Sequence, residues 1–350
     1  MHRIVYLDLI KVIGILSVVL IHTTGPIMYR VNDLAPGYWM TGNIFEAIAM
    51  MGVPLFFMVS GALLLSKNDE SLQEFFKKRI SRVIIPLILW SLIYILFKKF
   101  IIGAGYYNIS ILTYIANAFG DKAYYHLGFL YQIIGLYMFV PIIRVVVHNT
   151  KTKLLIYWII LWIIFGMINP FIKQLFGYKL YDMMPMMSGL FGYMILGYIM
   201  HKLKINKKIY ISAIGLILLS TVISIIGTDY ISHLHNKYNA LFSNYIGVFT
   251  MGQAIGWFIM LKYLSSKYIN YIQIQDIISQ LSIASFGVYL IHPIILYFLQ
   301  KLGIYALNGY NPLIIIPIVF MLTIITSYLF ITYIVLKMPY LRVYLLGEKY

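Results

Sequence analysis

Residues 4–24 read IVYLDLIKVIGILSVVLIHTT, an apolar stretch interrupted by Asp8, Lys11 and His22. A helix of about 20 residues, rising ~1.5 Å per residue, spans the ~30 Å hydrocarbon core of a bilayer. Similar apolar blocks recur along the chain. Of its 350 residues 61% are apolar and 11% are charged, whereas a soluble domain carries roughly 25% charged residues. The sequence therefore predicts an all-α integral membrane protein.

Ten apolar blocks predict ten transmembrane helices. They cover residues 4–24, 43–66, 83–102, 125–147, 154–171, 186–201, 209–227, 241–263, 281–300 and 313–337. Tyr and Trp crowd their ends, as in an interfacial belt. The first block is too long for a cleaved signal peptide and contains charges. The connecting segments are too short for a separate soluble domain, so we expect one membrane domain over residues 1–350.

The basic residues predict the orientation of the chain. Its net charge of +16 comes from 27 Lys and Arg against 11 Asp and Glu. Such an excess indicates nucleic-acid binding in a soluble protein, but in membrane proteins Lys and Arg gather in cytoplasmic loops beside anionic lipid. With ten spans, 18 basic residues fall on one side and 8 on the other, and Lys11 lies within the first span. We predict that the richer side and both termini are cytoplasmic, and we expect no nucleic-acid partner.

The first span combines three ionisable residues on one helical face. Lys11 and His22 are eleven residues apart, which is three turns plus about 20°, or ~16 Å along the axis. Asp8 lies near the same face, at i and i+3 from Lys11, so the two charges can neutralise each other. An ionisable group at membrane depth is a functional candidate. A plain ion pair with an interfacial histidine is the alternative interpretation.

Three further ionisable residues fall in the predicted outer half of the membrane. His126 opens the fourth span, His292 precedes Pro293 in the ninth, and Glu46 lies near the outer start of the second. Proline frees a backbone carbonyl and bends a helix, which often marks a cavity. With His22 these residues form a candidate acid–base cluster. A headgroup contact for His126 and a structural bond to the bent backbone for His292 stay open.

Two segments near the second and third spans carry weaker indications. Ser60 and Gly61 are small enough for close helix packing or for ligand approach. The segment FFKKRISRVIIP, residues 75–86, is basic and includes Arg79 and Arg82. It fits a phosphate-binding patch for an anionic cofactor, and it equally fits an anchor on anionic lipid. The chain has no cysteine, and we expect no metal site.

These motifs together resemble the acyltransferase-3 family of integral membrane O-acyltransferases, which modify bacterial surface polysaccharides. The family's first span carries a basic residue, ten residues and then histidine, here Lys11 and His22. Four motifs follow in the family's order: GVPLFFMVSG (52–61), RISRVIIP (79–86), HLGFLYQIIGLYMFVP (126–141) and SFGVYLIHPIIL (285–296). The family most often has Arg where this chain has Lys11. The planar guanidinium, which can make two parallel hydrogen bonds, is therefore replaced by a single ammonium group.

The resemblance implies a multi-pass protein of the plasma membrane that moves an acyl group, usually acetyl, from cytoplasmic acyl-CoA to a sugar hydroxyl at the outer face. Lys11, Arg79 and Arg82 would meet the CoA phosphates, and His22 would act as general base or become acylated. Glu46, His126 or His292 would assist His22, and Ser60 is a weak candidate for the oxyanion partner. An exporter or flippase for a polysaccharide or lipid-linked sugar is the main alternative, and a receptor is a third.

Overall fold

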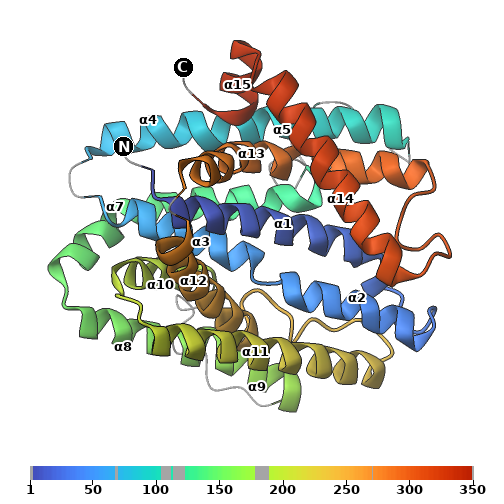
Figure 1. Ribbon diagram of the computed structural model, residues 1–350, viewed down its shortest axis with the longest axis horizontal. Helices are drawn as coiled ribbons and strands as arrows, with labels where there is room; N and C mark the ends of the chain where they lie inside the picture. The colour runs from blue at the N-terminus through green and yellow to red at the C-terminus, as the bar shows by residue number, and fades with distance from the viewer. Residues whose placement is uncertain are drawn as a thin grey trace. The chain divides into compact units, whose positions relative to one another are not determined.

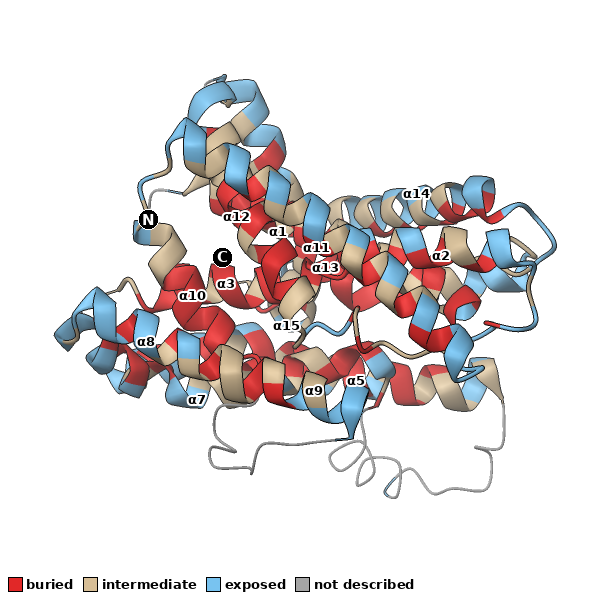
Figure 2. Cartoon of the chain, turned by 90° about the horizontal axis from the view of Figure 1, so that it is seen from below, coloured by how far each residue is buried: buried red, intermediate tan, exposed pale blue. Residues whose placement is uncertain are grey.

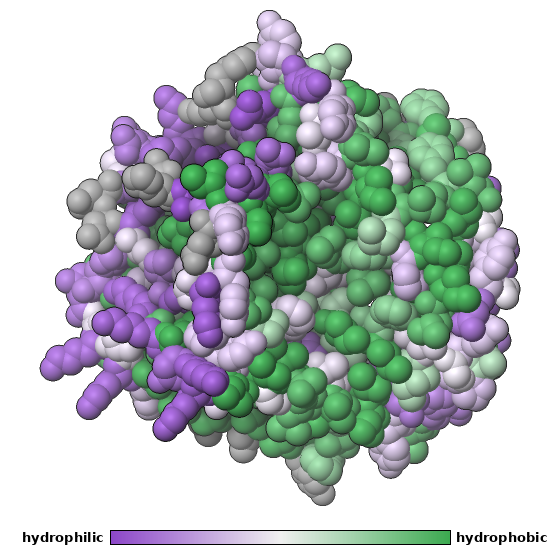
Figure 3. Space-filling model, viewed as in Figure 1, coloured by the Kyte–Doolittle hydropathy of each residue, from purple (hydrophilic) through white to green (hydrophobic). Residues whose placement is uncertain are grey.

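The computed structural model describes residues 3–67, 70–103, 112, 123–177, 189–269 and 271–348, and within these ranges it contains helices and no strand. Figure 1 shows the helices in chain order. Large apolar side chains lie on the outside, as on the surface of α11 (Lys207–Leu234), where Leu218, Leu219 and Ile226 are each about 60% exposed. The space-filling view likewise shows broad hydrophobic areas (Figure 3). Apolar helices with an apolar exterior confirm an all-α integral membrane protein.

Within the described ranges, eight helical segments are long and apolar enough to cross a membrane. Three of them are single helices: α1 (Val5–Met28), α11 and α13 (Ile272–Lys301). The others are composite: α2 (Pro36–Ala49) with α3 (Gly52–Leu64); α4 (Leu72–Arg79), η1 (Ile80–Ile84), α5 (Ile85–Phe97) and η2 (Lys98–Ile102); η3 (Tyr125–Leu127) with α7 (Gly128–Asn149); α8 (Thr152–Ile163), η4 (Ile164–Ile168) and α9 (Asn169–Phe176); and α14 (Pro312–Phe330) with η6 (Ile331–Val335).

The two remaining predicted spans correspond to α10 (Phe191–Lys202) and α12 (Val248–Tyr268). The predicted start of the sixth span, at residues 186–188, lies outside the described residues, and α10 has 12 residues. The 21 residues of α12 include the polar Thr250, Gln253 and Lys262, which make it less apolar than the other spans. Ten spans and two cytoplasmic termini therefore stay a prediction.

Contacts divide the chain into two compact units. The first comprises Met1–Ser66 and Val146–Tyr328, and the second comprises Lys67–Val145 and Leu329–Tyr350. We call them unit 1 and unit 2 and describe each by itself. The single membrane domain predicted over residues 1–350 stays a prediction.

In unit 1, α1 packs against α2, α3, α12 and α13, and α3 packs against α10. Glycines permit the last contact. A Cβ added at Gly61 would overlap the Met194 carbonyl of α10, and one at Gly197 would overlap the Met58 carbonyl of α3. Buried residues accordingly predominate on both helices (Figure 2). Because helices in lipid are not driven together by the hydrophobic effect, close packing at small residues such as these stabilises the crossing instead.

In unit 2, the helix formed by α4, η1 and α5 packs against α15 (Pro339–Leu346). The Trp90 indole donates to the Leu345 carbonyl at 3.1 Å. Gly347 ends α15 with φ of 63°, and a Cβ at this residue would overlap the Ser81 carbonyl. The glycine therefore allows the end of α15 to reach the backbone beside Arg82.

Candidate active site

In unit 1 the structure brings together two of the predicted histidines. The rings of His22, from α1, and His292, from α13, stack with 5.2 Å between their centroids and 24° between their planes. His292 is fully buried and His22 is half-buried. Two residues far apart in the sequence therefore form one stacked imidazole pair, of which His292 is the buried member.

The sequence His292-Pro293 explains how the second ring is held. Proline has no N–H, so Pro293 leaves the Tyr289 carbonyl without its helical donor. The Nδ1 atom of His292 lies 2.7 Å from that carbonyl oxygen and 3.2 Å from the Val288 carbonyl oxygen. α13 runs on through the proline to Lys301. The structural bond that the sequence left open is thus present.

This bond also assigns the tautomer of His292. A carbonyl oxygen only accepts, so Nδ1 carries the proton, and Nε2 of the neutral ring holds the basic lone pair. Two imidazolium rings stacked at this distance would repel each other strongly in a poorly hydrated site. A stacked pair at this distance therefore favours a state in which at most one ring is charged. A catalytic role of the pair stays a prediction.

The predicted ion pair lies on the same two helices. Asp8 Oδ1 accepts from Lys11 Nζ at 2.9 Å and from Ser282 Oγ of α13 at 2.7 Å. Asp8 is buried, while the Lys11 side chain is 29% exposed. Fourteen residues separate Asp8 from His22, which is ~21 Å along a helix. The helix pair α1–α13 thus carries a charged cluster near one end and the imidazole pair toward the other.

Glu46 is buried on α2, and its carboxylate accepts a hydrogen bond from the Tyr238 hydroxyl in the loop after α11. Burial, followed by the adjoining carboxylate, raises the pKa of Tyr238 above its ordinary value. The phenol therefore stays protonated and acts as a donor. Ser60 is half-buried on α3, beside the Gly61 contact. A role of Glu46 in orienting His22 and an oxyanion role of Ser60 stay predictions.

Three predicted residues belong to unit 2. His126 is 4% exposed in η3, and its ring packs edge-to-face on Tyr94 with 5.0 Å between centroids. That burial disfavours a headgroup contact. Arg79 is buried at the end of α4, whereas Arg82 is exposed in η1. The two arginines of the predicted phosphate-binding segment therefore have different environments.

Arg79 belongs to a cluster that the sequence did not predict. Its centre is Glu70, whose side chain is 4% exposed and lies within 4.0 Å of four cations. The cations are Lys67, Lys78, Arg79 and Arg144. Ser71 caps α4 by accepting from the Glu74 backbone N–H, which fixes Glu70 just before the helix. The sequence signal that could have indicated this cluster is the acidic residue Glu70 ahead of the basic residues 77–79. The contact with Arg144 depends on tertiary packing and could not be read from the sequence.

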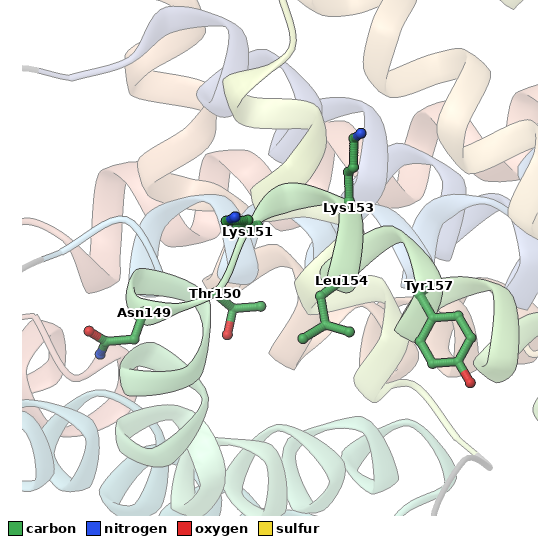
Figure 4. Close-up of a pocket in the computed structure, with 6 residues that line it drawn as sticks. All are labelled: Asn149, Thr150, Lys151, Lys153, Leu154 and Tyr157. Atoms are coloured by element: carbon green, nitrogen blue, oxygen red, sulfur yellow. The ribbon is translucent and has the colours of Figure 1, made fainter.

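The remaining candidates for a functional site are a surface recess and a metal-binding group. A shallow recess of about 490 Å³ at the α7–α8 turn is lined by Asn149, Thr150, Lys151, Lys153, Leu154 and Tyr157 (Figure 4). It contains none of the predicted site residues. Among the described residues, no group of three or more His, Asp or Glu side chains is arranged to hold a metal ion.

Apolar helices long enough to span a membrane, two of which bring His22 and His292 together, define an integral membrane protein with a candidate active site in unit 1. The chain belongs to the acyltransferase-3 family, whose acyltransferase domain matches residues 4–332. The resemblance carried by the sequence motifs is thereby confirmed, and the chain is a membrane acyltransferase. No curated protein and no solved structure matches the chain.

Proposed function

We propose that this membrane acyltransferase transfers an acetyl or other acyl group from cytoplasmic acyl-CoA to a hydroxyl of a cell-surface polysaccharide, or of its lipid-linked precursor, in the bacterial plasma membrane. The observation that carries the proposal is the stacked pair of His22 and His292. The pair combines a basic ring nitrogen with burial from water, and acyl transfer to a hydroxyl needs both.

In the proposed reaction an imidazole of the pair takes the proton of the acceptor hydroxyl as its oxygen attacks the thioester carbonyl. The tetrahedral intermediate then collapses, the C–S bond breaks, and the imidazolium returns the proton to the CoA thiolate. The products are the ester and free CoA, and the enzyme regains its starting state. We assign the proton transfer to His22 and the orientation of its ring to His292, whose own ring is fixed by the Tyr289 carbonyl.

The donor would be held from the cytoplasmic side. Arg79, Arg82 and Lys11 are the proposed contacts for the CoA phosphates, because guanidinium and ammonium groups are the usual partners of phosphate oxygens.

Mass spectrometry of the surface glycan, from cells with and without the protein, tests this function. Loss of the acetyl mass increment (or that of another acyl group) from an otherwise intact polymer is the expected result. Loss of the polymer itself would contradict acyl transfer and favour the exporter or flippase. Trapping the enzyme with radiolabelled acyl-CoA in the absence of acceptor distinguishes the two catalytic routes, since a label that stays on the protein indicates an acyl-histidine.

A further inference from the structure

In unit 2 the buried part of the Glu70 cluster carries an excess of positive charge. The side chains of Arg79, Arg144 and Glu70 are 10%, 9% and 4% exposed. Among the described residues, two guanidinium groups therefore face one carboxylate in a site that is nearly closed to water. Buried charge without a full complement of partners is unfavourable, so a further anion would stabilise this arrangement.

The aromatic surroundings hold the two arginines close to each other. The guanidinium carbon of Arg79 lies 5.0 Å from the centre of the Phe75 ring, and that of Arg144 lies 5.5 Å from it. Arg79 also lies 5.6 Å from the Tyr137 ring. Cation–π contacts on the shared Phe75 ring thus fix the planes of both guanidinium groups.

The N–H edge of Arg79 is the second observation that indicates a ligand. Among the described residues, the buried Nε and Nη2 atoms of Arg79 have no hydrogen-bond partner. Nη2 lies 3.9 Å from Glu70 Oε2, beyond hydrogen-bonding distance. Nε and Nη2 form one edge of the guanidinium, and that edge matches two oxygens of a phosphate group.

Glu70 fixes the remaining members of the cluster. Its Oε2 lies 3.3 Å from Arg144 Nη2, and its Oε1 accepts from Lys78 Nζ at 2.9 Å. Burial by itself would raise the pKa of this carboxyl, but the hydrogen bonds from Lys78 and Arg144 and the charges of Lys67 and Arg79 outweigh it and hold the pKa below its ordinary value. Glu70 therefore stays ionised and orients the cations around it.

We infer that Arg79 and Arg144 together form a phosphate-binding site, with Glu70 as the positioning residue that aligns the two guanidinium groups. Arg144 lies outside the basic segment 75–86 and Glu70 precedes it, so neither was a candidate from the sequence. Two sources supply such a phosphate: the CoA part of the donor, in which case the inference rests on the proposed function, and the headgroup of an anionic lipid.

Binding to the purified chain in lipid nanodiscs tests the inference without turnover. The probes are CoA and pantetheine, which is the phosphate-free part of CoA. The ratio of their affinities does not depend on the fraction of protein that is folded. We expect each of two variants to lower the ratio of CoA affinity to pantetheine affinity roughly ten-fold. They are Arg144→Lys, which keeps the positive charge but loses the planar guanidinium with its two parallel donors, and Glu70→Gln. Glu74→Gln is the matched control, because Glu74 is 64% exposed on the same helix, and it should leave the ratio unchanged.

The lipid arm of the experiment compares thermal stability in phosphatidylglycerol and phosphatidylcholine nanodiscs. If both variants lose the stabilisation by phosphatidylglycerol while the CoA-to-pantetheine ratio is unaffected, the phosphate belongs to a lipid headgroup. Folded Arg144→Lys and Glu70→Gln proteins that keep both the ratio and the lipid stabilisation would overturn the inference. Glu70→Asp adds a readout, since a shorter carboxylate should restore part of the affinity that glutamine loses.

Failure of the site is distinguishable from failure of the proposed function. A wild-type protein that binds CoA through Arg144 but transfers no acyl group contradicts the reaction and leaves the site in place. Conversely, active Glu70→Gln protein with an unchanged KM for acyl-CoA and unchanged lipid stabilisation contradicts the site and leaves the reaction in place.

Discussion

At the scale of single residues, His292 has a structural role in the structure and a chemical role in the proposed reaction. Nδ1 of His292 supplies the donor that Pro293 cannot give to the Tyr289 carbonyl, and this bond fixes the ring against His22. Asparagine has an N–H donor of similar reach but no basic ring nitrogen. Substitution at residue 292 can therefore separate the two roles.

We predict that His292→Asn folds with a melting temperature near that of the wild type, whereas His292→Ala is less stable, because the buried carbonyl then loses its side-chain donor. Both variants should lose about 10–100-fold in acyl transfer, because neither keeps the imidazole ring that orients His22 in the proposed reaction. Thermal unfolding and transfer assays on the same purified samples check this. If His292→Asn kept wild-type activity, the role of His292 would be limited to its hydrogen bond with the Tyr289 carbonyl.

Sequence alone identified both histidines because of their spacing and because ionisable groups are unfavourable at membrane depth. It could not identify the partners Ser282, Tyr238 and Arg144. Serine, tyrosine and a basic residue at the end of a span are ordinary in a membrane protein, and only tertiary packing brings them to Asp8, Glu46 and Glu70.

At the scale of helices, the crossing of α3 and α10 depends on two glycines that approach the opposite backbone. The predicted motif GVPLFFMVSG ends at Gly61, where a side chain would meet the Met194 carbonyl. Carbonyl groups within a helix do not move aside as a flexible side chain does. The packing role of this glycine is thus explained, whereas the proposed role of Ser60 awaits a substrate.

Gly61→Ala is expected to destabilise the protein by roughly 1–3 kcal/mol, because its methyl group forces the helices apart. Gly215→Ala is the control, since nothing lies within 4 Å of a Cβ at this α11 residue. There the loss of a helix-interior glycine should be neutral or slightly stabilising. Thermal unfolding in detergent compares the two. Equal melting temperatures would show that α3 and α10 do not cross as described.

The helix boundaries show what the apolar pattern predicts well and poorly. The first predicted span, 4–24, agrees with the start of Val5–Met28, which follows the polar Arg3, but the helix continues four residues further, through Gly25 and Pro26. The third, 83–102, begins at Leu72 instead, because the basic stretch before it is helical as well. Hydropathy detects the part of a helix that lies in lipid, but not the amphipathic turns that continue beyond it.

At the scale of the whole molecule, stability should depend on pH through Glu70. Its pKa in the folded protein is lowered, so its contribution is full above the unfolded value of about 4.3 and is lost as pH falls through the folded value. We predict that the melting temperature of the wild type exceeds that of Glu70→Gln at pH 7 and that this difference shrinks below about pH 4.3. A difference that stays constant down to pH 3 would contradict an ionised Glu70.

The predicted orientation can be tested with single cysteines, because the natural chain contains none. Tyr310→Cys, in the exposed loop before α14, should react with an impermeant maleimide on intact cells. Lys204→Cys, in the loop before α11, should react only after the membrane is opened. The reverse pattern would invert the topology and place the proposed acyl-CoA side outside.

Acyl transfer by membranes that contain His22→Ala is the decisive measurement for the proposed catalytic pair of histidines. Membranes with wild-type or variant chain, at equal amounts of folded protein, are supplied with radiolabelled acetyl-CoA and the polysaccharide acceptor. We predict that His22→Ala incorporates about 10²–10⁴-fold less label than the wild type, while His235→Ala, at the C-cap of α11 and without a role in the proposed reaction, incorporates as much. Incorporation by His22→Ala at the wild-type rate would contradict the assignment of the histidine pair as the catalytic site.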